Sequence, residues 1–278
     1  MCKVSIVIPY YNSEETILRA LESIKKQSFT DYEVVLVNDG STDNSEKIVN
    51  DFISKNDISI KNINQINKGP SSARNNGIKA SKGEYIAFLD SDDSYEPKKL
   101  EIQVEFMEKN KDIFITSTNY FIEKEDNLAL RYIEEKEYVE ANFYKMLFKF
   151  FFYLSSTMIR REIFEEGIFF EEGRFYAEDH LLFLQIARKY RGARLTMPLV
   201  RIYKSEFGEG GLTKNLNNLK VNEFINFKIL YKENVNHDKK ISMPLLGFVY
   251  AFAYLKHLKR VWKTTILRKN KNYAGGRK

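Results

Sequence analysis

The sequence predicts an α/β protein with a mostly parallel β-sheet covered by helices, followed by a helical, basic extension. Its first hundred residues alternate apolar runs of strand length with segments of helical period. The runs are continuously apolar, which is typical of parallel strands buried on both faces. With 278 residues and 43% hydrophobic content, the chain is long enough for a sizeable core.

The first hundred residues are expected to form successive β and α elements. A strand over 4–11, "VSIVIPYY", precedes a helical segment with apolar residues three or four positions apart. The next strand, 33–39, precedes a helix for which Ser41 or Thr42 is the predicted N-cap. A weaker strand, a helix and a further strand are expected over 59–65, 72–79 and 84–90.

Three of these strands end in polar residues: "PYYN", "NDGS" and "DSDD". Ligands of open α/β sheets bind beyond the carboxyl ends of the strands. We therefore expect these three segments to meet at one edge of the sheet.

The later part of the chain is less regular. A strand is expected over 112–123 and a helix within 176–190, whereas the aromatic segment 143–154 fits core, acceptor groove or subunit contact. Residues 1–215 are expected to form one catalytic domain and 216–278 the extension.

The carboxylates Asp90, Asp92 and Asp93 are crowded into four positions after an apolar strand. A helix start would need one of them, and three close together repel one another. A hard cation such as Mg²⁺ or Mn²⁺ prefers carboxylate oxygens and leaves positions open for substrate phosphates. The cluster therefore predicts a metal site that binds a phosphorylated substrate.

Several common functions lack their sequence patterns. The chain has no GxxxxGK[ST] segment, no GxGxxG after its first strand and no Cys or His cluster with zinc spacing. One cysteine and no secretion signal favour a cytoplasmic protein. A phosphatase with an aspartate nucleophile at a strand end stays an alternative, as does a non-catalytic nucleotide-sugar-binding module.

Four ordered blocks carry a family resemblance: "VSIVIPYYNSEETILRALESIKKQS", "EVVLVNDGSTDNS", "NKGPSSARNNGIKASKGEYIAFLDSDD" and "YAEDHLLFLQIA". They resemble the family-2 inverting glycosyltransferases of the GT-A fold. The resemblance implies a hexosyltransferase that uses Mn²⁺ or Mg²⁺ and a nucleotide-diphosphate sugar, most often a UDP-sugar. It also implies a hydroxyl acceptor on a glycan or lipid-linked glycan in bacterial surface polysaccharide synthesis.

The resemblance assigns the nucleotide side of the site. Pro9 and Tyr11 lie where the family cradles the nucleobase, and an aromatic ring can stack on a base. Asp39 lies where a carboxylate accepts a hydrogen bond from the base. Lys68 and Arg74 lie in the stretch that approaches the base and the diphosphate.

The resemblance also assigns the metal and the base. Asp90 is expected at the ribose, with Ser91 beside it, and Asp92 at the metal with help from Asp93. In "YAEDHLLF", Asp179 is the expected general base and Glu178 its neighbour; helix capping is the competing explanation. His180 is expected to be incidental.

Many relatives carry a late His or Arg that reaches the diphosphate. Here the corresponding stretch, "VRIYKSEFGEGGLTK", offers Arg201, Lys204 and Lys214 but no His. Its glycines suggest a mobile loop. The sequence does not choose among the three cations.

The extension carries a strong positive charge. Residues 239–278 contain eleven Lys or Arg and no Asp or Glu, so they carry a charge of +11. Because the net charge of the whole chain is +6, the first 238 residues carry −5. Its helical apolar stripe fits peripheral contact with an anionic membrane, or packing on the catalytic domain or on a second copy in a homodimer. Nucleic acid is disfavoured, because the cations are confined to the tail. The stripe is formed by Phe248, Phe252, Leu255, Leu258, Trp262 and Ile266.

Overall fold

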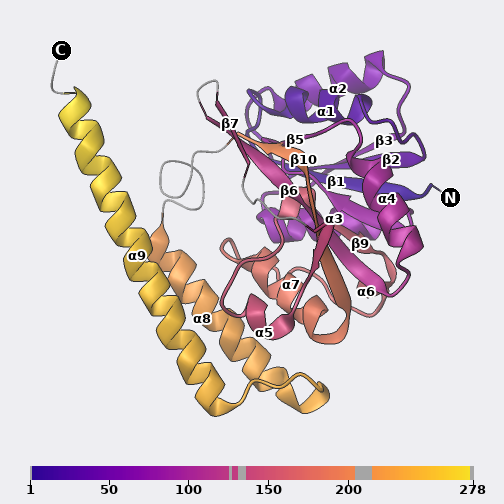
Figure 1. Cartoon of the computed structure of the whole chain (residues 1–278). Coiled ribbons are helices and arrows are strands. Elements are labelled where there is room, and N and C mark those ends of the chain that lie inside the picture. Colours follow the sequence, from indigo (N-terminus) through magenta and orange to yellow (C-terminus); the bar gives the residue numbers. More distant parts are fainter. Residues whose placement is uncertain (1, 125–126, 131–135, 204–214, 276–278) are drawn as a thin grey trace.

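The computed structural model describes residues 2–124, 127–130, 136–203 and 215–275 (Figure 1). Within these residues, ten strands form one mixed sheet. Eight of them follow the spatial order β3-β2-β1-β4-β9-β6-β10-β5, while β7 pairs with β6 and β8 pairs with β10. Helices flank the sheet, so the predicted α/β class is confirmed.

The first four strands are parallel to one another, as predicted. β1 lies between β2 and β4, so the strand order reverses there, at the position where such sheets bind ligands. The interior residues of β1, β2 and β4 are fully buried because helices cover both faces, whereas the edge strand β3 is partly exposed. The strands are β1 (Val4–Tyr10), β2 (Tyr32–Asn38), β3 (Ile60–Asn64) and β4 (Tyr85–Phe88).

Four helices alternate with these strands and pack on two sides of the sheet. One core cluster receives side chains from α1, α2 and α4, and α3 packs against the opposite face. The helices are α1 (Ile17–Lys25), α2 (Ser45–Lys55), α3 (Pro70–Ala80) and α4 (Lys99–Lys109).

The predicted cap of α2 was wrong. The helix begins at Ser45, with Asn44 as N-cap residue. Ser41 Oγ instead accepts a hydrogen bond from the backbone of Asn12, and the Thr42 backbone donates to Asn12 Oδ1. These two residues therefore join the loop after β2 to the loop after β1.

Beyond β4 the sheet becomes mixed. β9 runs antiparallel between β4 and β6, whereas β10 is parallel to β6. These later elements are β5 (Ser94–Tyr95), β6 (Ile113–Lys124), β7 (Asn127–Leu130), β8 (Tyr138–Glu140), α5 (Phe143–Met146), η1 (Leu154–Ser156), β9 (Met158–Arg160), α6 (Glu162–Glu165) and β10 (Arg191–Ile202).

The aromatic segment 143–154 contributes mainly to the core. Phe143 and Phe152 are fully buried and pack with side chains of α7 (Glu178–Lys189). Tyr144 and Phe150 are exposed. The segment thus joins core and surface.

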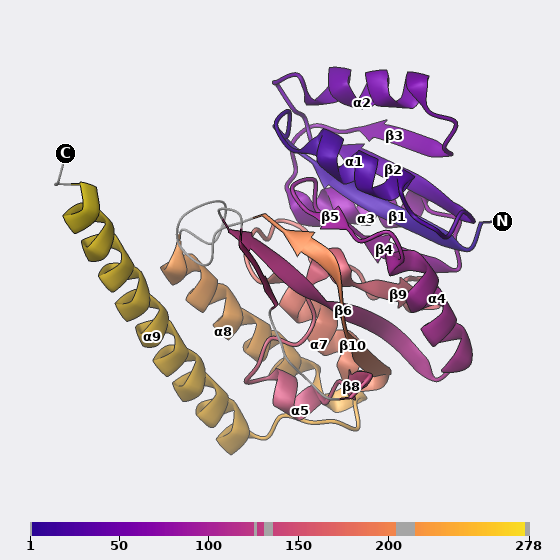
Figure 2. The same cartoon turned by 45° about the horizontal axis from the view of Figure 1, so that its top comes forward.

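The C-terminal helices lie beside one another and against the α7 side of the domain (Figures 1 and 2). Phe227 of α8 and Val249 of α9 are buried in the same cluster as the apolar face of α7. In the part of the chain that the structure describes, no helix has a stretch long and apolar enough to cross a bilayer. These elements are α8 (Leu216–Lys232), η3 (Glu233–Asn236) and α9 (Met243–Gly275).

Candidate active site

The three predicted carboxylates lie together after β4. One oxygen from each of Asp90, Asp92 and Asp93 falls within 4.8 Å of the others. Asp90 and Asp92 are half-buried, whereas Asp93 is fully buried. The three residues therefore differ in how far a ligand can approach them.

Asp93 is anchored by two hydroxyl groups from the segment before β9. Its Oδ2 accepts hydrogen bonds from Ser155 Oγ at 2.5 Å and Tyr153 Oη at 3.1 Å. Ser155 Oγ also accepts from the Asp90 backbone at 3.2 Å. Burial, and then the charge of Asp93, raises the pKa of Tyr153, which keeps it a hydrogen-bond donor. Asp93 thus fixes the turn, and its share in metal binding stays a prediction.

The turn is held from the other side by Arg19 of α1. The Arg19 Nη2 donates to the carbonyl oxygen of Asp92 at 2.8 Å, and its guanidinium lies 3.6 Å from the ring centroid of Tyr203. Ser13 and Ser91 hydroxyls lie 2.8 Å apart. Arg19 was not predicted as a site residue, because a single cation on an amphipathic helix gives no indication of such a distant contact.

The donor set fits a hard divalent cation. Three carboxylates present oxygen ligands within a small volume, and hydroxyl and guanidinium groups fix the backbone that carries them. Mg²⁺ and Mn²⁺ prefer such oxygens. Asp93 is buried and Asp90 is paired with Arg74, and the assignment of the ion to Asp92 stays a prediction.

The predicted nucleobase residues lie at the ends of β1 and β2. Tyr11 is 48% exposed directly after β1, so its ring is available for stacking, and Pro9 is half-buried in the strand. Asp39 is buried and accepts hydrogen bonds from the backbone nitrogens of Lys68 and Gly69 at 2.8 and 2.9 Å. Asp39 therefore braces the loop before α3, while the Lys68 side chain is exposed.

Two distant loops touch at Gly69. Its φ of +86° favours glycine, and a Cβ there would lie 2.7 Å from Cε1 of Phe175. Phe175 belongs to the loop before α7. The donor-side loop and the loop before the predicted base are therefore in direct contact.

Arg74 joins the carboxylate cluster to the start of α7. Its Nη2 lies 2.9 Å from Asp90 Oδ1 and its Nη1 lies 3.1 Å from Glu178 Oε1. Burial disfavours the charge on the guanidinium, but Asp90 and Glu178 outweigh it and raise the pKa of Arg74. This cation permits three acidic residues to crowd around it.

Asp179, the predicted general base, is the second residue of α7. Burial first, and the neighbouring Glu178 second, raise the pKa of Asp179 to about 7, although Arg74 opposes the shift. A carboxylate with such a pKa accepts a proton readily near neutral pH. Its neighbour His180 is buried, with Nε2 3.2 Å from the Met146 carbonyl, and burial lowers its pKa to about 4. His180 is therefore part of the core.

The backbone before the base is strained. Ala177 has a φ of +53°, which is uncommon for a residue other than glycine. Its carbonyl accepts hydrogen bonds from Asn226 Nδ2 of α8 at 2.8 Å and from the backbone of Leu181 at 3.2 Å. Asn226 was not predicted as a site residue, because it lies in the extension, far along the sequence from the predicted catalytic residues.

The predicted phosphate cations divide into two groups. Arg201 on β10 forms an ion pair with Glu96 and lies 3.9 Å from Glu123. Lys204 and Lys214 lie outside the described residues. The structure therefore shows acidic partners for Arg201, and the choice among the three stays open.

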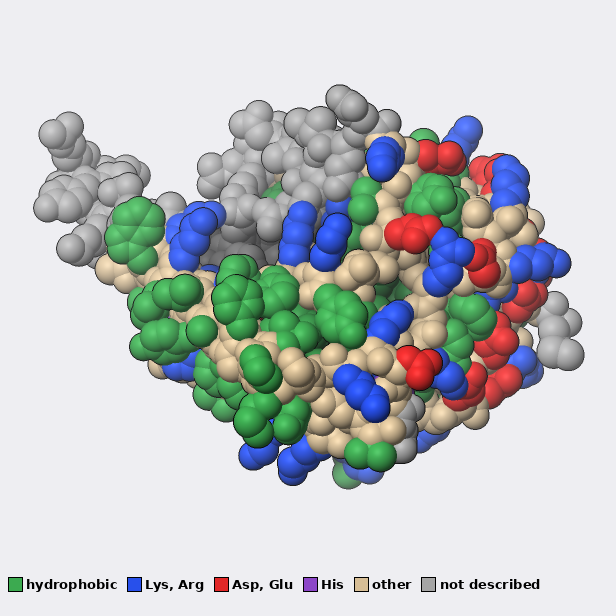
Figure 3. Space-filling model, turned by 60° about the horizontal axis from the view of Figure 1, so that its bottom comes forward, with side chains coloured by type: hydrophobic (Ala, Val, Ile, Leu, Met, Phe, Trp, Pro, Cys, Tyr) green, Lys and Arg blue, Asp and Glu red, His purple; other side chains and the backbone are tan. Residues whose placement is uncertain are grey.

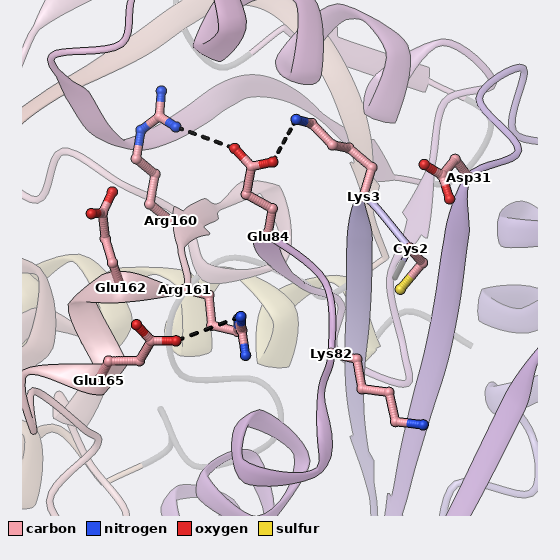
Figure 4. A pocket seen from close by; sticks show the side chains of 9 residues that line it. All are labelled: Cys2, Lys3, Asp31, Lys82, Glu84, Arg160, Arg161, Glu162 and Glu165. Carbon is pink, nitrogen blue, oxygen red and sulfur yellow. Dashed lines mark hydrogen bonds and ion pairs between the residues drawn. The ribbon is translucent and has the colours of Figure 1, made fainter.

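A cavity of about 430 Å³ lies at the opposite edge of the sheet, near the amino ends of β1, β2 and β4 (Figure 4). Its charges pair within the wall: Glu84 lies 2.5 Å from Lys3 and 3.7 Å from Arg160. Burial raises the pKa of Cys2 and disfavours a reactive thiolate. The cavity is therefore separate from the candidate active site.

The family is decided by a match to the family model described as glycosyl transferase family 2, over residues 5–168. The chain belongs to glycosyltransferase family 2. The match covers more than half of the chain, and the curated relatives that resemble it are named glycosyltransferases.

Curated relatives agree with family 2. An uncharacterized glycosyltransferase of Rickettsia bellii is 36% identical over 67% of this chain but only 26% of its own length. EpsJ of Bacillus subtilis is 33% identical over 72% of this chain and 60% of its own. WfaP of Escherichia coli, named a UDP-Glc:alpha-D-GlcNAc-diphosphoundecaprenol beta-1,3-glucosyltransferase, is 42% identical over 44% and 47%. The chain thus spans from about a quarter to 60% of these relatives.

Solved structures show the GT-A fold for this family 2 enzyme. TarS of S. aureus in complex with UDP-GlcNAc superposes with a TM-score of 0.70 at 22% identity, over 94% of this chain and 73% of TarS. A mannosyltransferase of Pyrobaculum calidifontis with GDP-Man and Mn²⁺ gives 0.66 at 20% identity, over 100% and 76%. The family model ends before α7, so Glu178 and Asp179 lie outside the matched segment.

Proposed function

We propose that the protein is a metal-dependent, inverting glycosyltransferase that moves a sugar from a UDP-sugar to a hydroxyl of a glycan or lipid-linked acceptor. The setting is bacterial surface polysaccharide synthesis at the cytoplasmic face of the membrane. Residues 1–215 form the catalytic domain in this proposal and 216–278 the extension. WfaP, whose name gives UDP-Glc as donor and a diphosphoundecaprenol-linked sugar as acceptor, supports both substrate classes.

One observation carries the proposal. The guanidinium of Arg74 contacts Asp90, at the end of β4, and Glu178, next to Asp179. The side chain of Arg74 therefore connects the carboxylates assigned to the donor with the residue next to the assigned general base. A transfer reaction requires this proximity, because donor and acceptor must meet in line.

The residues provide a balanced reaction. Asp179 accepts the proton of the acceptor hydroxyl. The hydroxyl oxygen at the same time attacks the anomeric carbon from the face opposite the diphosphate. The bond between that carbon and the diphosphate oxygen breaks with its electron pair leaving on the phosphate, so the configuration inverts. A metal ion held by Asp92, with Asp93 behind it, would stabilise the negative charge on the leaving group.

Asp90 binds the ribose in this proposal, and Tyr11 stacks on the nucleobase beside Pro9. Asp39 supports the nucleobase site indirectly, because its carboxylate holds the loop at Lys68 and Gly69. Arg74 neutralises the acidic residues without contacting the acceptor. The alternatives, a phosphatase and a non-catalytic module, are disfavoured by membership of a glycosyltransferase family.

Calorimetric titration with UDP, GDP and dTDP, with and without Mn²⁺, tests the donor site. We expect UDP to bind only with the ion, and Asp92→Ala to abolish that binding. Asp51→Ala, at an exposed aspartate of α2, is the matched control. If no nucleotide diphosphate binds, the proposed donor is wrong; the anomeric configuration of the product, measured by NMR, tests inversion.

A further inference from the structure

Helix α9 has one face that packs on the protein. Val249 and Ala253 are buried beside α8, and Lys256 and Arg260 lie 3.1 and 3.2 Å from the buried carboxylate of Glu223. Breaking such a buried ion network is costly. The orientation of α9 about its own axis is therefore fixed.

The opposite face of α9 carries the predicted apolar stripe in an exposed position. Phe248, Leu255 and Trp262 are 64%, 63% and 67% exposed, and Phe252 and Leu258 lie between them. Spacings of three, four and seven residues place these side chains on one side of the helix. Most of the stripe is therefore exposed, and its first residues, Phe248 and Phe252, contact the rest of the protein.

The stripe continues onto the segment around α5. The ring of Phe148 packs edge-on against Phe248 and Phe252, with centroids 5.6 and 5.3 Å apart. Tyr144 and Phe150, on the same segment, are exposed. We call the whole area the α5–α9 surface: it comprises the apolar residues Tyr144, Phe150, Phe248, Phe252, Leu255, Leu258 and Trp262 and the exposed lysines of the same two segments, Lys145, Lys149, Lys259 and Lys263.

The charge of this region selects the partner. Figure 3 shows apolar and basic side chains together on the α8 and α9 side of this face, while acidic side chains gather on the other side. Residues 239–278 carry a charge of +11. Two copies that joined through α9 would bring these charges together, whereas an anionic lipid surface would complement them.

We propose that the α5–α9 surface binds an anionic lipid bilayer, with α9 lying in the plane of the interface. Its aromatic and leucine side chains enter the headgroup region and its lysines contact lipid phosphates. Amphipathic helices with this composition bind membranes in that orientation. This membrane contact would bring the enzyme to a lipid-linked acceptor, and in that respect it rests on the proposed function.

Cosedimentation of the full chain with vesicles tests the surface. The vesicles contain phosphatidylcholine alone or with phosphatidylglycerol, at low and high NaCl. We expect salt-sensitive binding to the anionic vesicles and its loss in Leu255→Glu/Trp262→Glu. Val235→Glu, at a residue 86% exposed outside the surface, is the control. Lys259→Gln/Lys263→Gln should weaken binding roughly 25-fold, at about fivefold per cation, and Lys55→Gln/Lys109→Gln should not.

Two outcomes overturn the inference. One is unchanged vesicle binding by Leu255→Glu/Trp262→Glu; the other is a dimer in light scattering that this variant converts to monomer, without vesicle binding by the wild type. UDP titration of the same preparations separates the two proposals. Vesicle binding without UDP binding supports the surface and removes the donor, and the reverse result removes only the surface.

Discussion

The side-chain nitrogen of Asn226 lies 2.8 Å from the carbonyl oxygen of Ala177 and donates a hydrogen bond to it. Ala177 has left-handed backbone geometry and directly precedes Glu178 and Asp179. A contact from α8 thus holds the strained residue at which the helix of the proposed base begins. We therefore expect Asn226 to position Asp179.

Replacing Asn226 by Ala should lower kcat about fivefold and leave the KM for the donor nearly unchanged, because a hydrogen bond contributes ~1 kcal/mol. Steady-state kinetics with both substrates measures this split. Asn217→Ala, at an exposed residue of α8, is the control. An equal loss of donor affinity would show that Asn226 acts on the whole fold instead.

Asp179→Asn should abolish transfer and preserve UDP binding, since the amide cannot accept the proton. General-base catalysis contributes about 10²- to 10⁴-fold. In the wild type, kcat should rise as pH increases through about 7, where the carboxyl group loses its proton. Asp238→Asn, at an exposed residue, is the control. Near-normal turnover by Asp179→Asn would exclude it as the base.

Arg74→Met should destabilise the fold by about 3 kcal/mol at pH 8, because Asp90 and Glu178 lose their buried partner. The cost should be smaller at pH 5, where Asp179 is protonated and one negative charge is absent. Denaturant unfolding at the two pH values measures the difference. Arg191→Met, which breaks only exposed ion pairs, should cost less than about 1 kcal/mol. A pH-independent cost would contradict the charge argument.

Lys99→Met should stabilise the protein by about 2 kcal/mol at pH 7. Lys99 is fully buried, its Nζ lies 4.1 Å from the ring centroid of Tyr95, and it has no hydrogen-bond partner among the described residues. Burial lowers the pKa of Lys99 well below its ordinary 10.5, so the unfolded chain binds a proton that the folded chain lacks.

Wild-type stability should therefore rise as pH approaches 10.5, and this slope should weaken in Lys99→Met. Thermal unfolding from pH 7 to 10 tests it. Lys109→Met, at an exposed residue of the same helix, should change stability by less than about 0.5 kcal/mol. A destabilised Lys99→Met protein would show that the buried amine has a favourable partner.

Local patterns sufficed for the first half of the sheet. Continuous apolar runs predicted the parallel strands, and the crowding of Asp90, Asp92 and Asp93 predicted their common location. These features depend on neighbours in the sequence, and periodicity and charge repulsion report on such neighbours.

Contacts between distant segments could not be predicted in the same way. The antiparallel insertion of β9, the hydroxyls of Tyr153 and Ser155 on Asp93, and the bond from Arg19 to Asp92 join segments 60 or more residues apart. Ser41 was expected to cap a helix, but its hydroxyl accepts a hydrogen bond from the backbone of Asn12 instead. Propensity describes what a residue can do locally, and tertiary contacts decide among those options.

The contact between Gly69 and Phe175 limits how the enzyme can be recombined with its relatives. No methyl group fits between the loop before α3 and the loop before α7, and Arg74 adds a charged contact close by. A chimaera that takes its N-terminal half from one parent and its C-terminal half from another must therefore inherit a matched pair of loops. In such a chimaera, the loop before α3 and the loop before α7 should come from the same parent.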